Sequence, residues 1–418
     1  MPENNRIAVT SEIGKLEGVL LHKPGSEVEN MTPESAKRAL YSDILNLEVA
    51  LKEYDQFKAV LDSVTKTFEV KELLRDILLD ESVRMSLLDE ILSQEDVFGE
   101  DEFIRQIDPK QLAVQLIEGV PMKKDNLTKF LTKERFSLPP LHNFFFMRDA
   151  SVSIQNKILI GKMANKVRNR EALIMKAVFN HHPDFKTLTF DPSASNGCGE
   201  NCTIEGGDVL IVRDDIMVIG IGARTTSQGI DYILQCLKER KESRHIIIQE
   251  LPYTPESFIH LDMTFTMLDY DTCMVYEPLI LRPNKFQTVH ITIDNGKVVR
   301  INNVNNILEI LKDLGVDLKP VFCGGENDRT IQEREQWHSG ANFFAFAPGK
   351  VIGYGRNNYT IEALYKNGFE VIRAKDIMTG KTHPDGYDKC VVTIEGSELA
   401  RGGGGARCMT MPVRRLDI

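Results

Sequence analysis

The hydrophobic and polar positions of this chain repeat one hairpin pattern. Residues 149–161 and 208–220 each contain a short apolar strand, a polar turn, a second apolar strand and a closing glycine, with identical spacing. Residues 342–355 and 262–276 have the same pattern with slightly longer turns. Short β-prone runs separated by Asn, Asp, Pro or Gly are typical of β-hairpins. The pattern therefore predicts four related hairpins.

Two of these hairpins lead into a helical pattern and then another apolar strand. Residues 227–239 and 359–367 are predicted helices, and residues 245–249 and 369–373 are the strands that follow them. Alternation of this kind indicates an α/β fold built from ββαβ units.

A fifth, more degenerate copy lies near the amino terminus. It consists of a strand at 18–22, a long helix at about 41–64 and a strand at 67–71. Because one such unit cannot bury its own faces, five copies are expected to pack together and close into a ring. The expected fold class is a fivefold pseudosymmetric α/β propeller.

Residues 72–135 interrupt the repeat. Their composition changes to Leu, Glu, Asp, Lys and Arg with helical apolar spacing, and helices are predicted at about 101–107, 109–118 and 123–133. The predicted domains are a propeller made of residues 1–71 and 136–418 and an all-helical insertion at 72–135.

Composition and charge narrow the classes of function. The chain has 418 residues, of which 42% are hydrophobic, so it can bury a large core. A net charge of -10 argues against nucleic-acid binding and favours a small cationic substrate. Residues 1–6 and the rest of the chain contain no apolar run of membrane-spanning length, so we expect a cytoplasmic protein without a membrane partner.

The seven cysteines are expected to be reduced. Their odd number and the size of the chain argue against a disulfide framework. Cys198 and Cys202 lie near His181 and His182, which raises the question of a zinc site. Because no second pair has the spacing of a zinc finger, the interpretation favoured for this pair is two loop thiols, and no metal is expected.

A single cysteine near the carboxyl terminus is the candidate nucleophile. Cys408 follows the glycine run 402–405 and stands between Arg401 and Arg407. Glycines permit close backbone approach, and neighbouring cations favour the thiolate over the thiol.

Polar residues recur where each hairpin begins. Asp149, Asp208, Asp262 and Asn342 occupy equivalent positions of the repeat, so a ring would bring them towards one end of its axis. Two carboxylates match the planar donors of a guanidinium group. Asp149 and Asp262 are the two that we select as its receptor.

Proton transfer in such a site requires a group with a near-neutral pKa. His260 lies two residues from Asp262, so an extended segment would place both on one face. Glu205 precedes two glycines that permit a tight turn into the pocket. His260 and Glu205 are the candidates for acid–base chemistry.

These residues stand in motifs that resemble the arginine deiminases, guanidine-hydrolysing members of the pentein superfamily. The resemblance extends essentially from end to end and is carried by residues 139–149, 205–208, 260–262, 333–337 and 407–412. It implies a fivefold pseudosymmetric propeller with a helical insertion, no cofactor, and hydrolysis of L-arginine to citrulline and ammonia. The partners expected are L-arginine and further copies of this chain.

The resemblance also implies a role for each site residue. Cys408 would be the nucleophile, His260 and Glu205 would assist proton transfer, and Asp149 and Asp262 would hold the guanidinium. The groups implied to hold the rest of the substrate are Asn143, Arg168 and Arg224 at its α-carboxylate and Phe146 at its aliphatic stem.

The cysteine loop departs from the family pattern. Some members have histidine directly before the nucleophile and an arginine inside the glycine run, whereas Arg407 precedes Cys408 here and residues 402–405 are all glycine. Either Arg401 or Arg407 could therefore be the residue that gates the site.

Three other functions stay open at this point. The protein could be another guanidine-modifying enzyme, such as an amidinotransferase or a hydrolase of agmatine or methylated arginine. It could be a binding protein on the same ring, which would have no use for Cys408. It could also be a zinc hydrolase.

Overall fold

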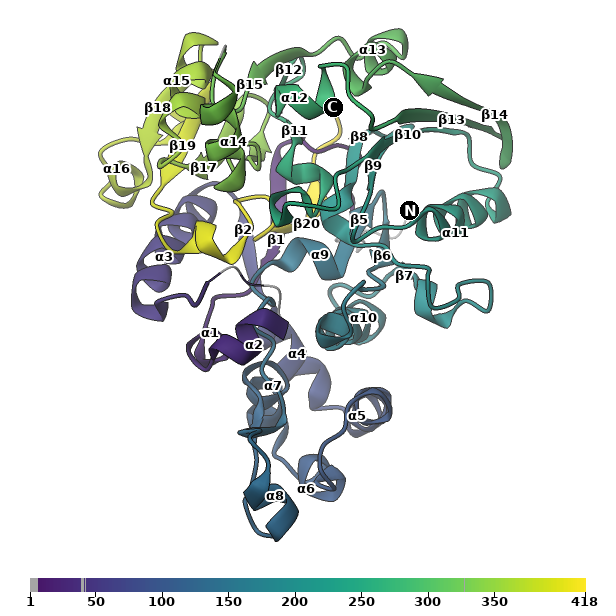
Figure 1. The fold of residues 1–418 in the computed structure, drawn as a ribbon, viewed down its shortest axis with the longest axis vertical. Helices are drawn as coiled ribbons and strands as arrows, with labels where there is room; N and C mark the ends of the chain where they lie inside the picture. The colour runs from purple at the N-terminus through teal and green to yellow at the C-terminus, as the bar shows by residue number, and fades with distance from the viewer. Residues whose placement is uncertain (1–6, 39–40, 42, 327) are drawn as a thin grey trace.

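The computed structural model describes residues 7–38, 41, 43–326 and 328–418 of a mixed α/β protein. Figure 1 shows a broad part rich in strands and a narrower helical part that projects from one end. In the described ranges, no helix combines the length and apolar character that crossing a membrane requires. The expectation about residues 1–6 lies outside the described residues.

The four hairpins predicted from the sequence are confirmed. Each is an antiparallel strand pair joined by a short turn. The pairs are β5 (Ser151–Ile154) with β6 (Lys157–Ile160), β8 (Val209–Arg213) with β9 (Ile216–Ile221), β11 (Phe265–Met267) with β12 (Thr272–Val275), and β16 (Phe344–Ala347) with β17 (Lys350–Tyr354).

A third strand lies parallel to the second strand of each hairpin. In three units this strand comes after a helix: β7 (Leu188–Phe190) after α10 (Asn169–His181), β10 (Arg244–Glu250) after α11 (Ser227–Glu239), and β15 (Lys319–Phe322) after α13 (Ile307–Asp313). In the fourth unit, β17 pairs instead with β19 (Cys390–Ile394). There α15 (Asn358–Lys366) leads to β18 (Glu370–Arg373), which forms the edge beyond β19.

Both chain ends build the fifth unit. Strand β20 (Met411–Arg415) pairs antiparallel with β1 (Leu16–Leu21), and β1 pairs parallel with β2 (Lys66–Glu69) across α3 (Leu47–Val64). Helix α3 begins later than predicted because the Asn46 side chain caps it by accepting the Val49 N–H. Residue 42, which falls in the predicted helix, lies outside the described residues. This unit brings Cys408, just before β20, beside the amino-terminal strand.

One hairpin was not predicted. Strands β13 (Thr288–Asp294) and β14 (Lys297–Val304) add to β10 and extend its sheet to five strands. In the described part of the chain, the sheets of these five units are open at their edges, and closure of the units into a fivefold ring stays a prediction.

The insertion contains five helices. They are α4 (Val70–Leu78), α5 (Glu81–Gln94), α6 (Asp101–Arg105), α7 (Pro109–Glu118) and α8 (Leu127–Leu131). Asp80 caps α5, and Asp108 caps α7 with proline at the first helical position, which explains where both begin. The region is not wholly helical as expected, since β3 (Val120–Pro121) pairs with β4 (Phe136–Leu138).

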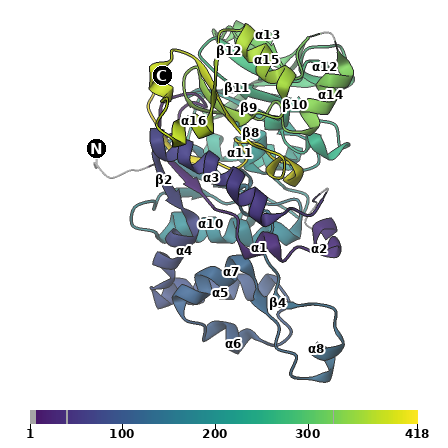
Figure 2. The same cartoon turned by 90° about the vertical axis from the view of Figure 1, so that its left-hand side faces the viewer.

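The insertion is tied to the strand-rich part through packing. One hydrophobic core continues from α4, α5 and α7 into α10 and β6, and Figure 2 shows α10 directly above these helices. The remaining helices are short elements of the connections: α1 (Ser26–Glu29), α2 (Pro33–Arg38), α9 (Met147–Ala150), α12 (Glu277–Ile280), α14 (Arg329–Trp337) and α16 (Ala374–Met378).

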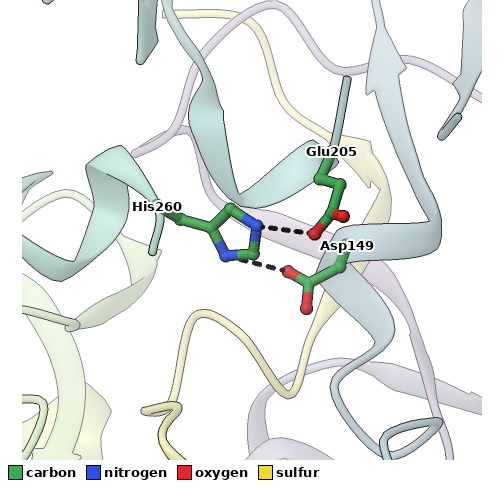
Figure 3. A group of neighbouring side chains, drawn as sticks. All are labelled: Asp149, Glu205 and His260. Atoms are coloured by element: carbon green, nitrogen blue, oxygen red, sulfur yellow. Dashed lines mark hydrogen bonds and ion pairs between the residues drawn. The ribbon is translucent and has the colours of Figure 1, made fainter. Parts of the chain in front are cut away.

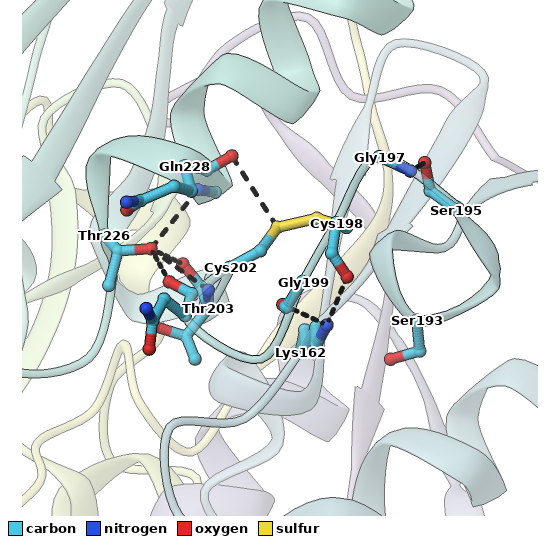
Figure 4. Close-up of a disulfide and its surroundings, with 12 residues drawn as sticks. Lys162, Ser193, Ser195, Gly197, Cys198, Gly199, Cys202, Thr203, Thr226 and Gln228 are labelled. Carbon is cyan, nitrogen blue, oxygen red and sulfur yellow. Dashed lines mark hydrogen bonds between the residues drawn. A yellow bond between two sulfur atoms is a disulfide. The ribbon is translucent and has the colours of Figure 1, made fainter.

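Cys198 and Cys202 are joined by a disulfide (Figure 4). The expectation that all seven cysteines are reduced is wrong for this pair. The loop between them turns back so that their Cα atoms lie 5.3 Å apart, a separation that permits the bond. Lys162 fastens the same loop by donating hydrogen bonds to the carbonyl oxygens of Cys198 (3.0 Å) and Gly199 (2.9 Å). The other five cysteines are free.

Candidate active site

The Cys408 sulfur lies in a buried polar cluster. The side chain is 2% exposed, and its Sγ is 3.6 and 3.8 Å from the two carboxylate oxygens of Asp262. The Asn342 amide donates to the same sulfur across 3.2 Å. The sulfur and one of the two predicted guanidinium receptors are therefore in direct contact.

His260 bridges two carboxylates (Figure 3). Its Nε2 is 2.9 Å from Glu205, and its Nδ1 is 3.5 Å from Asp149. All three side chains are buried. Asp149 is thus the predicted receptor carboxylate that contacts the histidine.

Short helical turns ahead of the hairpins position these groups. Asp149 lies in α9, Asp208 in the 3-10 turn Gly206–Asp208, and Asp262 in the 3-10 turn Leu261–Met263. Residues 260–262 do not form one extended segment, because the backbone is extended at His260 and then turns at Leu261. The turn, rather than strand alternation, brings His260 and Asp262 into one cluster.

Glycine is required beside the histidine. A Cβ atom on Gly207 would lie 2.6 Å from two atoms of the His260 ring, closer than packed atoms approach. The Glu-Gly-Gly-Asp run therefore allows the backbone to pass against the imidazole.

The charges of His260 and Glu205 stabilise each other. Burial alone would lower the pKa of His260, but Asp149 and Glu205 outweigh it and raise that pKa to about 9. Burial alone would raise the pKa of Glu205, but His260 and Arg224 hold it at about 2. The pair is an imidazolium with a carboxylate at neutral pH.

Cys408, the predicted nucleophile, carries a protonated thiol in this state. Burial and the negative charges of Asp262 and Asp149 raise the pKa of Cys408 well above its ordinary value, and Arg407 offsets only part of this effect. The expectation that neighbouring arginines favour the thiolate is outweighed. A cation placed between Asp262 and the sulfur would reverse the balance.

Both receptor carboxylates already hold guanidinium groups. Asp149 accepts a hydrogen bond from Arg168 across 2.8 Å, and Arg168 also makes contacts of 2.8 to 3.1 Å with Glu171. Asp262 accepts one from Arg407 across 2.9 Å. The two acids therefore have the position and charge to bind this planar cation.

The residues predicted to bind the substrate α-carboxylate line two different cavities. One of about 750 Å³ is lined by Arg224, Arg401 and Trp337, and another of about 340 Å³ is lined by Asn143 and Arg168. Among the described residues, neither cavity is lined by the five buried groups of the cluster, Cys408, His260, Glu205, Asp149 and Asp262.

The Gly402–Gly405 run lies against an aromatic side chain. A Cβ atom on Gly402 would stand 3.0 Å from the Phe146 ring, and one on Gly404 would overlap that ring and approach the Cβ of Cys408 at 3.0 Å. Phe146 is buried beneath this loop. Gly404 therefore lies close to both Phe146 and Cys408.

The two candidate gating arginines occupy different environments. Arg401 is partly exposed at the rim of the larger cavity and pairs with Asp43 and Glu398. Arg407 is 1% exposed and pairs with Glu12 as well as Asp262. Its guanidinium is held from behind the site and does not border either cavity.

Asp149, Glu205 and His260 also have a geometry that could hold a metal ion. Their ligand atoms all lie within 4.8 Å of one another. Arg168 stands 2.8 Å from Asp149, and His260 carries a proton, so both compete with a divalent cation for these ligands. The arrangement favours a cationic organic group over a metal.

Sequence reasoning missed two members of the cluster. Asn342 was recognised as a repeat position but not as a ligand of the sulfur, although its carbonyl oxygen also accepts the N–H groups of Arg407 (2.9 Å) and Cys408 (3.2 Å). Glu12 gave no signal, because it meets Arg407 only through the pairing of the two chain ends.

Comparisons with known proteins give a family match over nearly the whole chain. Residues 37–415 match the arginine deiminase family. The arginine deiminase of Streptococcus uberis is 32% identical over 443 residues, which cover all of both chains. That of Mycoplasma capricolum is 33% identical over 423 residues, covering 99% of this chain and 98% of the relative.

A solved structure shows the same fold at low identity. SxtG, an amidinotransferase from Microseira wollei in the saxitoxin biosynthetic pathway, aligns over 99% of this chain and 98% of its own with a TM-score of 0.56 and 15% identity. The similarity concerns the fold alone. From the family match and the full-length relatives, the chain belongs to the arginine deiminase family.

Proposed function

We propose that this protein is an arginine deiminase that hydrolyses L-arginine to L-citrulline and ammonia on a fivefold pentein propeller. One observation carries the proposal: Asp149 and Asp262 each bind a guanidinium of the protein itself, and Asp262 lies 3.6 Å from the Cys408 sulfur. A substrate guanidinium between these acids would present its carbon to the sulfur.

Substrate binding would activate the nucleophile. Burial and the charges of Asp262 and Asp149 keep Cys408 protonated, and a guanidinium held by the two acids opposes both effects because its positive charge favours the thiolate. The thiolate then attacks the guanidinium carbon and forms a C–S bond. The thiol proton is lost to solvent when the substrate cation binds, because His260 already carries a proton, and the attack opens one C–N π bond so that the carbon becomes tetrahedral.

His260 would move protons in both halves of the reaction. It donates its proton to the departing nitrogen, so that the C–N bond breaks and ammonia leaves an S-alkylthiouronium intermediate. The neutral imidazole, held by Glu205, then accepts a proton from water as the water oxygen attacks the same carbon. The C–S bond breaks, and citrulline and the thiol are released.

The remaining substrate contacts require an exchange of partners. Arg168 must leave Asp149 to admit the substrate, and it would then meet the α-carboxylate together with Asn143 and Arg224. Phe146 would pack on the aliphatic stem. Arg401, at the rim of the larger cavity, is the better placed gate, whereas Arg407 would fix the orientation of Asp262.

The domains, partners and location complete the proposal. Residues 1–71 and 136–418 form the catalytic propeller, and 72–135 is an insertion. The protein assembles with copies of itself in the cytoplasm and requires no metal.

An arginine assay with three variants tests the function. Wild-type protein should release equal amounts of citrulline and ammonia without an added amine, and Cys408→Ser should release neither. Cys236→Ser, at a free cysteine outside the cluster, should match the wild type. Acid quenching during turnover should trap an adduct on the peptide that contains Cys408.

The same assay separates the alternatives. Equal turnover of agmatine, which lacks the α-carboxylate, would contradict the substrate assignment. Product formation only with an amine acceptor would indicate an amidinotransferase. Activity that is lost with chelator and restored by a metal ion would indicate a metal hydrolase.

A further inference from the structure

One of the four repeated polar positions has no part in the reaction proposed above. Asp149 and Asp262 are the predicted receptor carboxylates, and Asn342 binds the cysteine sulfur. Asp208 occupies the equivalent position of its own unit and is 0% exposed. A buried carboxyl group is costly unless it makes compensating contacts. The contacts of Asp208 therefore indicate what this residue does.

Asp208 holds the turn that carries two members of the buried cluster. Its Oδ1 accepts the backbone N–H of Leu261 across 2.9 Å. Leu261 stands between His260 and Asp262 and begins the 3-10 turn Leu261–Met263. One hydrogen bond to Asp208 therefore fixes the backbone between the predicted acid–base histidine and a predicted receptor carboxylate.

The same kind of contact recurs in another unit. The Asn342 carbonyl oxygen accepts the N–H groups of Arg407 and Cys408 at 2.9 and 3.2 Å. In both units, the polar residue at the start of one hairpin accepts N–H groups from the segment just before a strand of the next unit, β11 or β20. Because two repeat positions are used in the same way, the contact of Asp208 is a feature of the architecture.

A glycine provides the space for this contact. A Cβ atom on Gly220, in β9, would overlap the Asp208 Oδ1 and would lie 2.9 Å from the Leu261 Cβ. Only a residue without a side chain leaves room for the two groups to meet there. The position of the carboxylate is therefore fixed by packing as well as by its hydrogen bond.

Asp208 also acts on His260 through its charge. Burial alone would lower the pKa of His260, but three neighbouring carboxylates raise it to about 9, and they are Asp149, Glu205 and Asp208. Burial raises the pKa of Asp208 itself to about 7; the charge of Glu205 adds to this effect, whereas His260 and the Leu261 N–H oppose it. Asp208 is thus ionised over the pH range in which His260 gives up its proton.

We propose that Asp208 is a positioning residue for the reaction, which holds the turn from His260 to Asp262 in place and stabilises the charge of the histidine. It acts through the turn and the imidazole rather than through contact with the substrate. The inference rests on the proposed function, because it concerns the same site.

Three variants separate the hydrogen bond of Asp208 from its charge. Asp208→Ala removes both, whereas Asp208→Asn keeps an oxygen that can accept the Leu261 N–H and removes the charge. Gly220→Ala displaces the carboxylate and leaves its charge in the site. Asp269→Asn, at a buried acid outside the cluster, and Gly355→Ala, at the closing glycine of the fourth hairpin, are the matched controls. Circular dichroism verifies that each variant is folded.

Kinetics with arginine, at the optimum pH of each variant, test the positioning. Asp208→Ala and Gly220→Ala should each lower kcat about tenfold or more, because a displaced histidine or carboxylate loses its alignment with the reacting atoms. Asp208→Asn should lose less than Asp208→Ala, and both controls should match the wild type. Wild-type kcat in Asp208→Ala or Gly220→Ala, or equal losses in the two Asp208 variants, would overturn the proposal.

An NMR titration of the His260 imidazole tests the charge without turnover. Its ring signals are assigned by their absence in His260→Gln. The pKa of His260 should fall by about 0.5 or more in Asp208→Asn, and the alkaline limb of the kcat profile should move to lower pH with it. An unchanged titration would overturn the electrostatic role. If the titration shifts as expected but the wild type releases no citrulline, the proposed function fails and the effect of Asp208 on His260 stands.

Discussion

Arg401 and Arg407 flank the same cysteine loop, yet their replacement should have very different consequences. We compare Arg401→Met with Arg407→Met, since methionine keeps much of the length of the side chain and removes its charge. Arg407 is 1% exposed and makes hydrogen bonds of 2.8 to 3.0 Å to Glu12, Asp262 and the Val209 carbonyl oxygen. Its loss leaves two buried carboxylates without their cation.

The magnitude follows from two independent considerations. Removing one partner of a buried ion pair costs about 3–5 kcal/mol. Burial alone would raise the pKa of Glu12, but Arg407, together with Arg148 and Arg415, lowers it from 4.5 to about 2, which corresponds to about 3 kcal/mol at neutral pH for the three cations combined. Arg401 is 38% exposed and pairs with the more exposed Asp43, and such surface pairs contribute about 0.2–1 kcal/mol. We therefore expect Arg407→Met to lose about 3 kcal/mol or more and Arg401→Met about 1 kcal/mol or less.

Urea unfolding followed by circular dichroism at neutral pH measures both values, and citrulline release gives the kinetics. Arg401→Met should change kcat and KM together if Arg401 gates the larger cavity. Arg407→Lys should fall between the wild type and Arg407→Met in stability, because lysine keeps the charge but not the planar fork. A loss below about 1 kcal/mol for Arg407→Met, or a larger loss for Arg401→Met, would refute the structural role of the buried pair.

Three further changes test the cluster. The pKa of His260 is raised from 6.5 to about 9, so the positive charge that stabilises the folded protein is complete below pH 6.5 and is lost as the pH rises through 9. The free energy of unfolding should therefore fall more steeply from pH 7 to 9 in the wild type than in His260→Gln. Asn342→Ala leaves two buried N–H groups without an acceptor, so the free energy of unfolding should fall by about 1–3 kcal/mol, and kcat should fall too. Wild-type values of both quantities would contradict the contact between Asn342 and the Cys408 sulfur. Gly404→Ala should reduce turnover because its methyl group overlaps Phe146, and Gly199→Ala, which meets no atom within 4 Å, should behave like the wild type in the same assay.

The repeated units were predictable because their signals are local. Alternating apolar residues and turn residues predict the hairpins, and the bounds of α7 and α11 agree with the sequence interpretation because each begins at a side-chain cap. The β13–β14 hairpin was missed because Val299 and Ile301 on β14 are about 60% exposed, so its pattern did not indicate a half-buried strand. Its position depends on β10, a partner whose choice is decided by tertiary pairing.

The candidate site was predictable in its members but not in its contacts. Cys408, His260 and the carboxylates stand out by residue type and repeat position. Glu12, the partner of Arg407, does not stand out in the sequence. It lies 395 residues from Arg407 in the chain and meets it only where β20 joins β1. The thiol was expected to ionise more easily because sequence neighbours were counted, whereas burial and two carboxylates from distant units determine its protonation.

The occupied receptor carboxylates give the proposed reaction a basis for substrate selection. Arg168 neutralises Asp149 in this structure, so a substrate guanidinium can bind there only by releasing the Arg168 side chain, which also holds Glu171. The Arg168 guanidinium then keeps Glu171 but loses one of its two buried carboxylates, and the α-carboxylate of arginine can replace the one that is lost. Agmatine would displace the same arginine without offering that anion, so it would bind at a net cost in electrostatic free energy. On this proposal, the enzyme selects arginine because the Arg168–Asp149 ion pair is exchanged for an ion pair between Arg168 and the substrate α-carboxylate. The Arg168 contact alone would not give this selection.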